Sequence, residues 1–291
     1  LVPSTTTKMN TRNIGNFLHV YMIHVTFNDS DSIQSFNQAQ QHQQHQNIKI
    51  GKCLRNFEFK NSHIHKKKMP KQNSSKLKKA ERKAQILQNV KEKKARDELV
   101  EKANEVDDVL STLKPFCKYE KNGVSVGLKF FKRSQLTDEL AEWTFSLLKE
   151  NMKTIYEKGG WGWDDSKKRK ELFDQNARFL IAFDGDEKPV GFSHFRFEVE
   201  GQTVVLYIYE LQIHADFRSK GIGKHMTGTL ELIALRHKME WVMLTVFKEN
   251  KSSMNFFMDK MRYAIDETSP SNTSIYDEST YEILSKSLVR K

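Results

Sequence analysis

The chain has 291 residues, of which 37% are hydrophobic and 29% charged, so it can bury the core of one or two domains. No run of about 18 uninterrupted apolar residues occurs, so neither a spanning helix nor a membrane partner is expected. Two cysteines, Cys53 and Cys117, exclude a disulfide framework. No group of cysteines and histidines has metal-ligand spacing, so we expect no metal.

The net charge of +11 is concentrated in one tract. Between Lys66 and Arg96 the sequence holds thirteen Lys or Arg and two Glu, an excess equal to the whole net charge. The remainder is formally neutral and need not bind polyanions. The basic tract is interpreted either as a solvated helix face or as a nuclear-localisation or polyanion-docking segment, and the sequence leaves both open.

Residues 1–68 show no sustained hydrophobic periodicity and contain a run of Gln, His and Asn over residues 37–47. Such a composition cannot easily offset the entropy of ordering, so we expect a disordered low-complexity extension. The character changes at Met69. We expect Met69 to be the natural initiator with 1–68 upstream of it, and a genuine disordered tail is the alternative.

Residues 69–114 are predicted to be a basic N-terminal helical segment. Lys76–Leu113 contains neither Gly nor Pro and predicts one long helix or two, ended by Pro115. The second half of this stretch has apolar positions that would pack on a domain: Leu99, Val100, Ala103, Val106, Val109, Leu110 and Leu113.

Residues 115–291 are predicted to form one domain of the α/β class. Amphipathic or apolar periods predict helices at Asp138–Tyr156, Gly221–His237 and Ser252–Lys260. The same criteria predict strands at Val124–Phe131, Phe179–Phe183, Val190–Val199, Val204–Ile213, Trp241–Phe247, Tyr263–Ile265 and Tyr281–Leu284. We therefore expect an open, mixed and mostly antiparallel sheet flanked by helices.

A glycine-rich loop lies between the strand ending at Ile213 and the following helix. It reads Arg218-Ser219-Lys220-Gly221-Ile222-Gly223. A helix N-terminus offers free N–H groups and a positive dipole end, which together bind phosphate. The pattern is neither a Walker loop nor a dinucleotide fingerprint, and alone it is weak.

In this context, after a strand and opening a helix, R-x-x-G-x-G resembles the acetyl-CoA signature of the GNAT superfamily. The resemblance implies a GNAT fold and acetyl-CoA as co-substrate. It also implies a bulge in the strand before the loop, and a gap to the next parallel strand that takes the pantetheine arm. The implied cofactor-binding residues are Leu211, Gln212, Ile213, Arg218, Ser219, Lys220, Gly221, Ile222, Gly223, Lys224, Thr245 and Asn250.

A closer resemblance rests on several strings: Trp161-Gly162-Trp163, residues 192–197, residues 207–212, residues 242–248 and residues 281–284. These are similar to the histone-specific N-terminal acetyltransferases of the superfamily, over Met69 to Lys286. The resemblance implies acetylation of the α-amino group of histones four and two-A, which begin Ser-Gly-Arg-Gly. It further implies a monomer in cytoplasm and nucleus that takes histone tails as substrate. The basic helix would contact ribosome or nucleosome.

Glu210 is the candidate general base, acting directly or through a water, and Tyr209 is the second candidate catalytic residue. In a regular strand their side chains would point to opposite faces, whereas a bulge would let both approach the site. The alternative for Glu210 is a structural carboxylate paired with a loop cation. Backbone N–H groups near Leu211 would polarise the thioester carbonyl.

Substrate selection is expected to rest on acidic and aromatic residues. Glu198 and Glu200 could pair with the substrate arginine. The walls of a narrow slot would be Tyr156, Trp161, Tyr207 and Tyr281, and the resemblance implies that Tyr156, Tyr209 and Tyr281 contact the substrate amine and backbone. Trp161 and Trp163 could instead be core aromatics. Glu198 stands where the family has a shorter Asp, and residues 254–257 lack the tyrosine that many members use as an acid.

Two other functions remain open at this stage. One is a GNAT enzyme that acetylates internal lysines or a small amine. The other is a polyanion-binding module in which the same fold has lost activity, which the basic tract would favour.

Overall fold

The computed structural model describes residues 72–274 and 277–289, with side chains from Lys78 onward. The extension predicted over residues 1–68 lies outside this range. The helices are α2 (Gln72–Glu105), α3 (Asp138–Lys158), α4 (Asp165–Leu172), α5 (Ile222–Arg236), α6 (Lys251–Asn255) and α7 (Pro270–Thr273). A π-helical turn, Phe256–Lys260, continues α6.

The described strands form one eight-stranded sheet in the order β1-β2-β3-β4-β5-β6-β8-β7. Their bounds are β1 (Lys118–Lys121), β2 (Val124–Lys132), β3 (Arg178–Phe183), β4 (Pro189–Glu200), β5 (Thr203–Ile213), β6 (Trp241–Phe247), β7 (Ala264–Ile265) and β8 (Tyr281–Ser287). Strands β5 and β6 pair in parallel, and the other neighbours pair antiparallel. The prediction of a mixed, mostly antiparallel sheet flanked by helices is confirmed.

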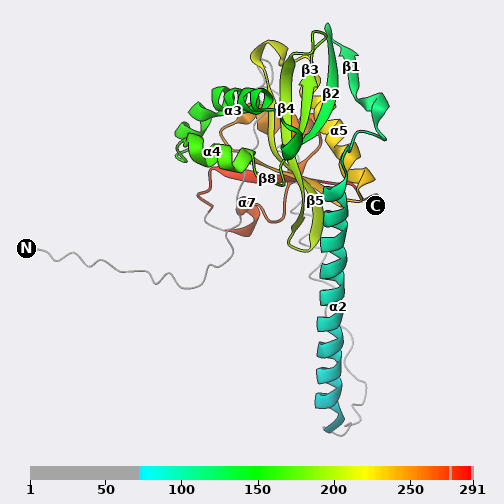
Figure 1. Cartoon of the computed structure of the whole chain (residues 1–291). Helices are drawn as coiled ribbons and strands as arrows, with labels where there is room; N and C mark the ends of the chain where they lie inside the picture. The colour runs from blue at the N-terminus through cyan, green and yellow to red at the C-terminus, as the bar shows by residue number, and fades with distance from the viewer. Residues whose placement is uncertain (1–71, 275–276, 290–291) are drawn as a thin grey trace, which may run out of the picture.

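Helices cover both faces of the sheet, with α3 and α4 on one side and α5 on the other (Figure 1). The α5 side holds the larger core, where Met226 and Leu230 of α5 pack against Leu206 and Ile208 of β5. On the opposite face Leu148 of α3 belongs to a second core. Because both faces of the central strands are covered, β3, β4 and β5 are almost continuously buried rather than alternating.

The N-terminal helix α2 is long but shorter than predicted at its C-terminal end. It stops at Glu105, so the prediction of helix up to Leu113 is wrong for residues 106–113, which form turns. Asp108 offers its carboxylate to the backbone N–H of Leu110 at 2.8 Å, a local bond that competes with helix. The apolar residues of this stretch are nonetheless buried in the main core as expected, including Val109 and Leu113.

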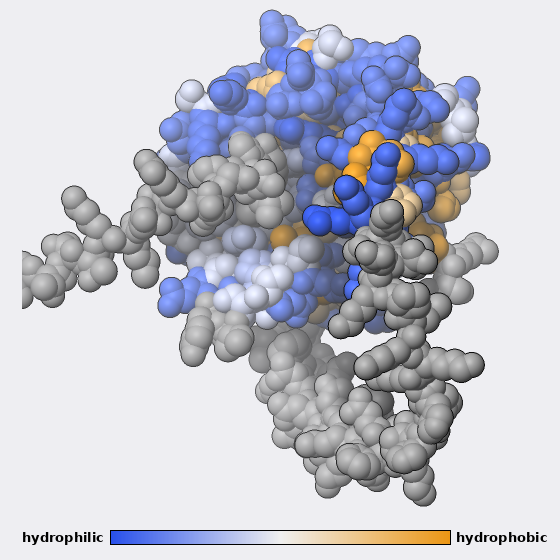
Figure 2. Space-filling view, turned by 90° about the horizontal axis from the view of Figure 1, so that it is seen from below, coloured by the Kyte–Doolittle hydropathy of each residue, from blue (hydrophilic) through white to orange (hydrophobic). Residues whose placement is uncertain are grey.

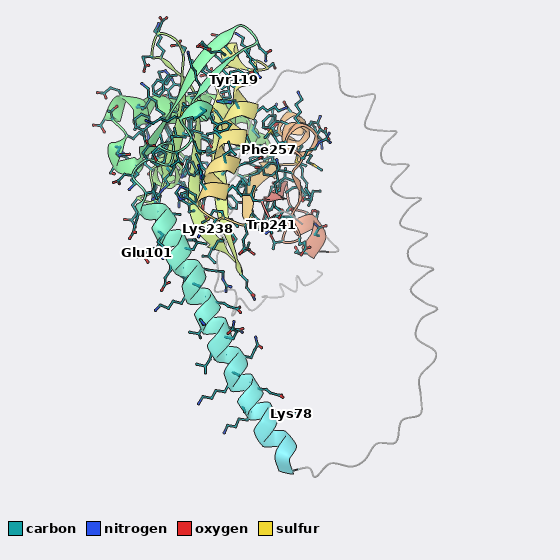
Figure 3. The ribbon with its side chains drawn as sticks, turned by 90° about the vertical axis from the view of Figure 1, so that its right-hand side faces the viewer. Lys78, Glu101, Tyr119, Lys238, Trp241 and Phe257 are labelled. Carbon is teal, nitrogen blue, oxygen red and sulfur yellow. The ribbon has the colours of Figure 1, made fainter. Side chains whose placement is uncertain are left out.

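Residues 78–95 of α2 are exposed along their whole length, and the helix projects as a rod away from the domain (Figures 1 and 3). Seen from below, the described surface is largely hydrophilic with scattered hydrophobic residues (Figure 2). Three of the exposed apolar side chains, Ile86, Leu87 and Val90, lie on this rod. No helix in the described ranges is long and apolar enough to cross a bilayer.

Three described elements were not predicted: β1, α4 and α7. Helix α4 reads DSKKRKEL and has no apolar period. It begins where the Asp164 side chain accepts a hydrogen bond from the backbone N–H of Lys167 at 3.0 Å, a capping contact rather than a hydrophobic stripe. Leu172 is the buried apolar residue of α4.

Candidate acetyl-transfer site

Strand β5 contains a β-bulge at the predicted position. His194 of β4 pairs with Glu210, and the following residue Phe195 pairs with Ile208, so Tyr209 is the extra residue on β5. One extra residue shifts the alternation of side chains beyond it by one. Tyr209 and Glu210 therefore both face the α3–α4 side, where they line the same small void.

Strands β5 and β6 part beyond the bulge. Their last parallel pair joins Ile208 to Leu244, although β5 continues to Ile213 and β6 to Phe247. No described strand pairs with the β6-facing edge of residues 209–213. This is the gap that the sequence resemblance implied, and an extended ligand arm can lie in it and bond to backbone as a strand does.

The loop after β5 is shaped to leave the N-terminus of α5 open. Ser219 and Gly221 have φ of 58° and 90°, and Gly221 is the N-cap of α5. Among the described residues, no side chain caps the first turn of this helix. Its N–H groups and the positive end of its dipole are therefore available to a phosphate.

The β1–β2 hairpin supports this loop from one side. The Tyr119 hydroxyl donates to the Lys220 carbonyl at 2.8 Å, and Asn122 Nδ2 donates to the same carbonyl at 3.1 Å. A Cβ on Gly221 would lie 2.1 Å from the Tyr119 oxygen. Glycine is thus required at this position by both its φ and its surroundings.

Arg218 supports the loop from the other side. Its Nε donates to the Ile213 carbonyl at 3.2 Å, and an Nη donates to Asn151 Oδ1 of α3. Burial lowers the pKa of this guanidinium. Lys220 has its ammonium 5.4 Å from the ring of Phe217. Direct phosphate contact by these two cations stays a prediction.

The remaining predicted cofactor residues surround the gap in different ways. Leu211, Ile213, Ile222 and Gly223 are buried, while Ser219 and Lys224 are exposed at the loop surface. The Thr245 hydroxyl is engaged with the Tyr207 hydroxyl.

Asn250 caps α6, its Oδ1 accepting from the N–H of Ser253 at 3.0 Å. Its buried Nδ2 finds no hydrogen-bond partner among the described residues. This amide donor lies just after the end of β6. It could donate to an acyl-CoA, because the pantetheine arm carries carbonyl acceptors.

Glu210 is buried at the bulge and shares a void of about 10 Å³ with Lys168, His194 and Tyr209. Burial raises the pKa of Glu210 to about 8, although Lys168 at 3.9 Å and a 3.0 Å hydrogen bond from Gln212 act to lower it. A base of this pKa matches an α-amino group, which titrates at about 7.7–8.0. The void is at the lower size limit for one water, about 10–15 Å³.

Lys168 of α4 is a site residue that the sequence did not reveal. Its ammonium lies 3.0 Å from Glu171 Oε2 and 4.4 Å from the centre of the Tyr156 ring. Burial opposes its charge, but Tyr156, Glu210 and Glu171 outweigh burial and raise the pKa of Lys168. Lys168 lines both the small void and a larger cavity, so it stands between them.

Tyr209 and Glu198 form a second polar group on the same face. The Tyr209 hydroxyl donates to the Glu198 carboxylate, with oxygens at 2.6 and 2.7 Å, and Arg196 lies 4.5 Å over the Tyr209 ring. Burial raises the pKa of Glu198 and also of Glu200. The ring of Tyr207 lies 5.0 Å from that of Tyr209.

Aromatic residues wall the larger cavity, which measures about 260 Å³ and is lined by Tyr156, Trp161 and Trp163 among others. Trp161 is 43% exposed and contacts Tyr281 edge-on at 5.8 Å. Trp163 is half-buried and packs against Tyr156 at 5.4 Å. Trp161 therefore lies at the cavity wall rather than in the core, and Trp163 packs more deeply.

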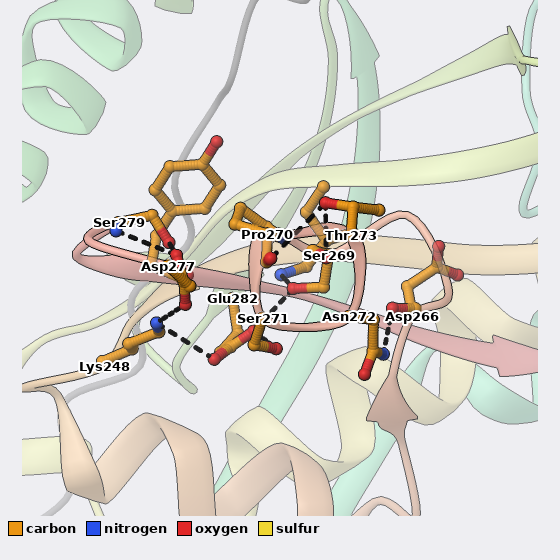
Figure 4. A network of polar contacts seen from close by, with 12 residues as sticks. Lys248, Asp266, Ser269, Pro270, Ser271, Asn272, Thr273, Asp277, Ser279 and Glu282 are labelled. Atoms are coloured by element: carbon orange, nitrogen blue, oxygen red, sulfur yellow. Dashed lines mark hydrogen bonds and ion pairs between the residues drawn. The ribbon is translucent and has the colours of Figure 1, made fainter. Parts of the chain in front are cut away.

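A polar network fixes the segment before Tyr281, including α7 (Figure 4). The buried Glu282 carboxylate accepts from the hydroxyls of Ser269 and Ser271 at 2.6 and 2.7 Å, and Lys248 bridges it to Asp277. Downstream, Thr280 Oγ1 accepts from the Trp161 indole N–H at 2.9 Å. The segment thereby holds one wall of the cavity in place.

The predicted site residues thus gather into three connected parts. The open α5 terminus and the β5–β6 gap suit a phosphate and an extended arm. Glu210 can accept a proton from an amine, and the aromatic cavity can admit the group that carries the amine. Within the described ranges, no cluster of His, Cys, Asp or Glu could hold a metal.

Residues 137–261 match the model of the acetyltransferase (GNAT) family, less than half of the chain. Solved structures give weaker similarities. A Thermoplasma acidophilum PaiA N-acetyltransferase with coenzyme A is 18% identical, covering 55% of this chain and 99% of that one at a TM-score of 0.41. An Arabidopsis thaliana Naa50 with a bisubstrate analogue is 19% identical, covering 57% and 100% at 0.41. A NatC complex with Gag peptide and CoA is 16% identical, covering 56% and 99% at 0.43.

The family match spans the elements that build the site. It runs from the start of α3 through the bulged β5, the glycine loop and α5 to the end of the π-helical turn. The similarities to solved structures identify no substrate for this chain. Residues 137–261 thus combine the GNAT fold and a match to the acetyltransferase (GNAT) family with a site that suits acetyl-CoA.

Proposed function

We propose that this chain transfers the acetyl group of acetyl-CoA to the α-amino group of proteins beginning Ser-Gly-Arg-Gly. These are histones four and two-A, the substrates of N-alpha-acetyltransferase D. The observation that carries the proposal is Glu210. This buried carboxyl has a pKa of about 8, and the void that it lines shares Lys168 and Glu171 with the aromatic cavity. An α-amino group at about 7.7–8.0 is a better match for it than a lysine at about 10.4.

The acidic residues of β4 support the arginine preference. Glu198 and Glu200 follow Arg196 on the same face, and both carboxylates carry pKa values raised by burial. A guanidinium brought next to them would restore the ionised form and bind two oxygens at once. Tyr209, bonded to Glu198, would link the arginine subsite to the bulge that carries Glu210.

The proposal is tested by mass spectrometry of a Ser-Gly-Arg-Gly peptide with a free or a blocked amino terminus. The free peptide should be acetylated and a blocked peptide containing lysine should not. Equal acetylation of the blocked peptide would favour an enzyme for internal lysines instead. Glu210→Gln should lower kcat by about 10²- to 10⁴-fold, the usual contribution of a general base, with little change in the KM for acetyl-CoA.

We also propose that α2 docks on a polyanion, ribosomal or nucleosomal, consistent with action in cytoplasm and nucleus. Its residues 78–95 are exposed and carry seven basic side chains against two acidic ones. Binding to purified ribosomes and nucleosomes should weaken steeply with salt, because phosphate contacts release counterions. A chain beginning at Asp97 should lose this binding and keep peptide acetylation; retained binding would contradict the proposal.

A further inference from the structure

Four polar side chains form a continuous hydrogen-bonded line from the cofactor loop to Glu210. Arg218 donates to Asn151 Oδ1, and Asn151 Nδ2 donates to Gln212 Oε1 at 2.9 Å. Gln212 Nε2 then donates to Glu210 Oε2 at 3.0 Å. Asn151 belongs to α3. The line therefore runs from the loop after β5 to a helix on one face of the sheet, and from there back to β5.

The chemistry of the groups fixes the direction of every bond. A guanidinium has donors only, so the atom that Asn151 turns to Arg218 must be its oxygen. Its amide nitrogen is then left for Gln212, whose own nitrogen is left for Glu210. The orientation of both side-chain amides therefore follows from the donors of Arg218. It does not depend on distinguishing the amide nitrogen from the amide oxygen by their coordinates.

This direction has a consequence for Glu210. Its Oε2 receives a donated hydrogen, so a proton on this carboxyl belongs on Oε1. Oε1 is the oxygen that lies 3.9 Å from the Lys168 ammonium, and Lys168 lines the larger cavity. The line thus turns Oε1 toward Lys168. It keeps Oε2, which accepts from Gln212, out of proton exchange.

We propose that Asn151 and Gln212 are positioning residues that tie the cofactor loop to the catalytic carboxylate, holding Glu210 with Oε1 toward the acceptor amine. The inference rests on the proposed role of Glu210 as base. Gln212 is fully buried, and Asn151 is half-buried beneath the loop, where its Nδ2 also lies 3.3 Å from the Ile213 carbonyl. The same loop that takes the pyrophosphate therefore sets the geometry of proton transfer.

Other charged or titratable groups also face Glu210 and must be kept unchanged in a test. They come from four elements: Tyr156 of α3, Lys168 and Glu171 of α4, His194 of β4, and Tyr209 of β5. Burial and the nearby cations hold the pKa of His194 well below its usual value, so His194 stays neutral.

The test is a double-mutant cycle read by titration. Gln212→Met removes the amide beside Glu210 with little change in volume, and Asn151→Leu removes the link to Arg218. Each should move the Glu210 titration midpoint upward by about one pH unit, because a hydrogen bond to the ionised form is lost or misdirected. The double variant should move it no further than Gln212→Met alone, since coupled residues are not additive.

The midpoint is read from the ¹³C resonance of the Glu210 carboxyl in the full chain, identified by its absence in Glu210→Gln. Coenzyme A affinity, measured by calorimetry, should fall about five- to tenfold in Asn151→Leu because Arg218 loses an acceptor. Asn122→Leu is the matched control, because it removes one of the two side-chain hydrogen bonds to the Lys220 carbonyl on the opposite side of the loop. It should weaken coenzyme A binding without moving the midpoint.

An Asn151→Leu midpoint equal to that of the unaltered chain would overturn the inference, as would fully additive shifts in the double variant. Both readouts are independent of which amine is acetylated. If the Ser-Gly-Arg-Gly peptide is not a substrate, the proposed function fails while the titration still decides whether the line exists.

Discussion

At the residue scale, Glu210 and Lys168 are opposite charges that share one buried space. Their closest atoms are 3.9 Å apart, longer than a hydrogen bond, and Lys168 instead bonds closely to Glu171. Lys168 therefore acts on Glu210 through its field. It lowers a pKa that burial would otherwise raise further. Removing it leaves a buried carboxyl without this compensation.

Lys168→Met should move the acid limb of the pH profile of kcat/KM to higher pH. Glu210 must be ionised to act as base, so activity rises as pH passes about 8. Without Lys168 we expect the midpoint to rise by about one further unit, which at pH 7 is roughly a tenfold loss of activity. Lys170→Met removes the same charge from an exposed position of the same helix. An equal shift in both variants would contradict a local effect.

At the element scale, two glycines of α5 and its N-cap have different roles. Gly221 forms the N-cap at φ 90° against the Tyr119 hydroxyl, so it serves the loop. Gly228 lies in the helix interior, and a Cβ there would meet nothing within 4 Å. The first glycine is required by geometry, whereas the second only adds flexibility.

Gly221→Ala should lower the free energy of unfolding by about 1–3 kcal/mol, the cost of a non-glycine residue at positive φ. It should also weaken coenzyme A binding, because the loop must shift away from Tyr119. Gly228→Ala should instead raise the free energy of unfolding by up to about 1 kcal/mol. Chemical denaturation of both variants measures the difference, and equal destabilisation would show that Gly221 has no special role.

The elements that sequence could predict are those with an apolar period. Helix α3 and strand β6 were predicted within two residues of their ends, since their buried faces repeat regularly. Helix α4 has no such face, and beyond the end of α2 the Asp108 carboxylate accepts from the backbone N–H of Leu110, which competes with helix. Local sequence cannot reveal either outcome, because capping contacts compete with propensity.

The residues of the site also differ in whether the sequence could predict them. The glycine loop and Glu210 could be predicted as site residues because they lie close together along the chain in a characteristic pattern. Asn151 was missed because its partners Gln212 and Arg218 lie 61 and 67 positions away, and only the folded sheet brings them together. Lys168 is hidden for the same reason, in a helix that otherwise resembles a solvated charged surface.

At the scale of the whole molecule, α2 has two parts with different dependence on the domain. The part before Arg96 is exposed, whereas Ala103 is 3% exposed in the main core. The Asn104 carbonyl accepts from the buried Arg178, and Asn104 Nδ2 donates to the Phe197 carbonyl at 3.3 Å. Only the C-terminal part of the helix is thus integral to the fold.

Two truncations separate these parts. A chain beginning at Arg96 should unfold at an unchanged temperature, because the described side chains that it loses, those of residues 78–95, are all exposed. A chain beginning at Val106 should lose more than about 2 kcal/mol of stability, the order of one buried apolar side chain, and leave Arg178 with the Asn176 carbonyl as acceptor but without that of Asn104. Thermal unfolding by calorimetry measures both. Equal melting temperatures for the two chains would show that α2 contributes nothing to the core.

The projecting rod also affects how the size of the molecule will be measured. A helix of 34 residues is about 50 Å long at 1.5 Å per residue, and its exposed part projects from the domain. An elongated shape increases the hydrodynamic radius. The chain should therefore elute in gel filtration at the position of a dimer even when it is a monomer. Light scattering, which reports mass independently of shape, is therefore the method that can test whether this acetyltransferase is a monomer.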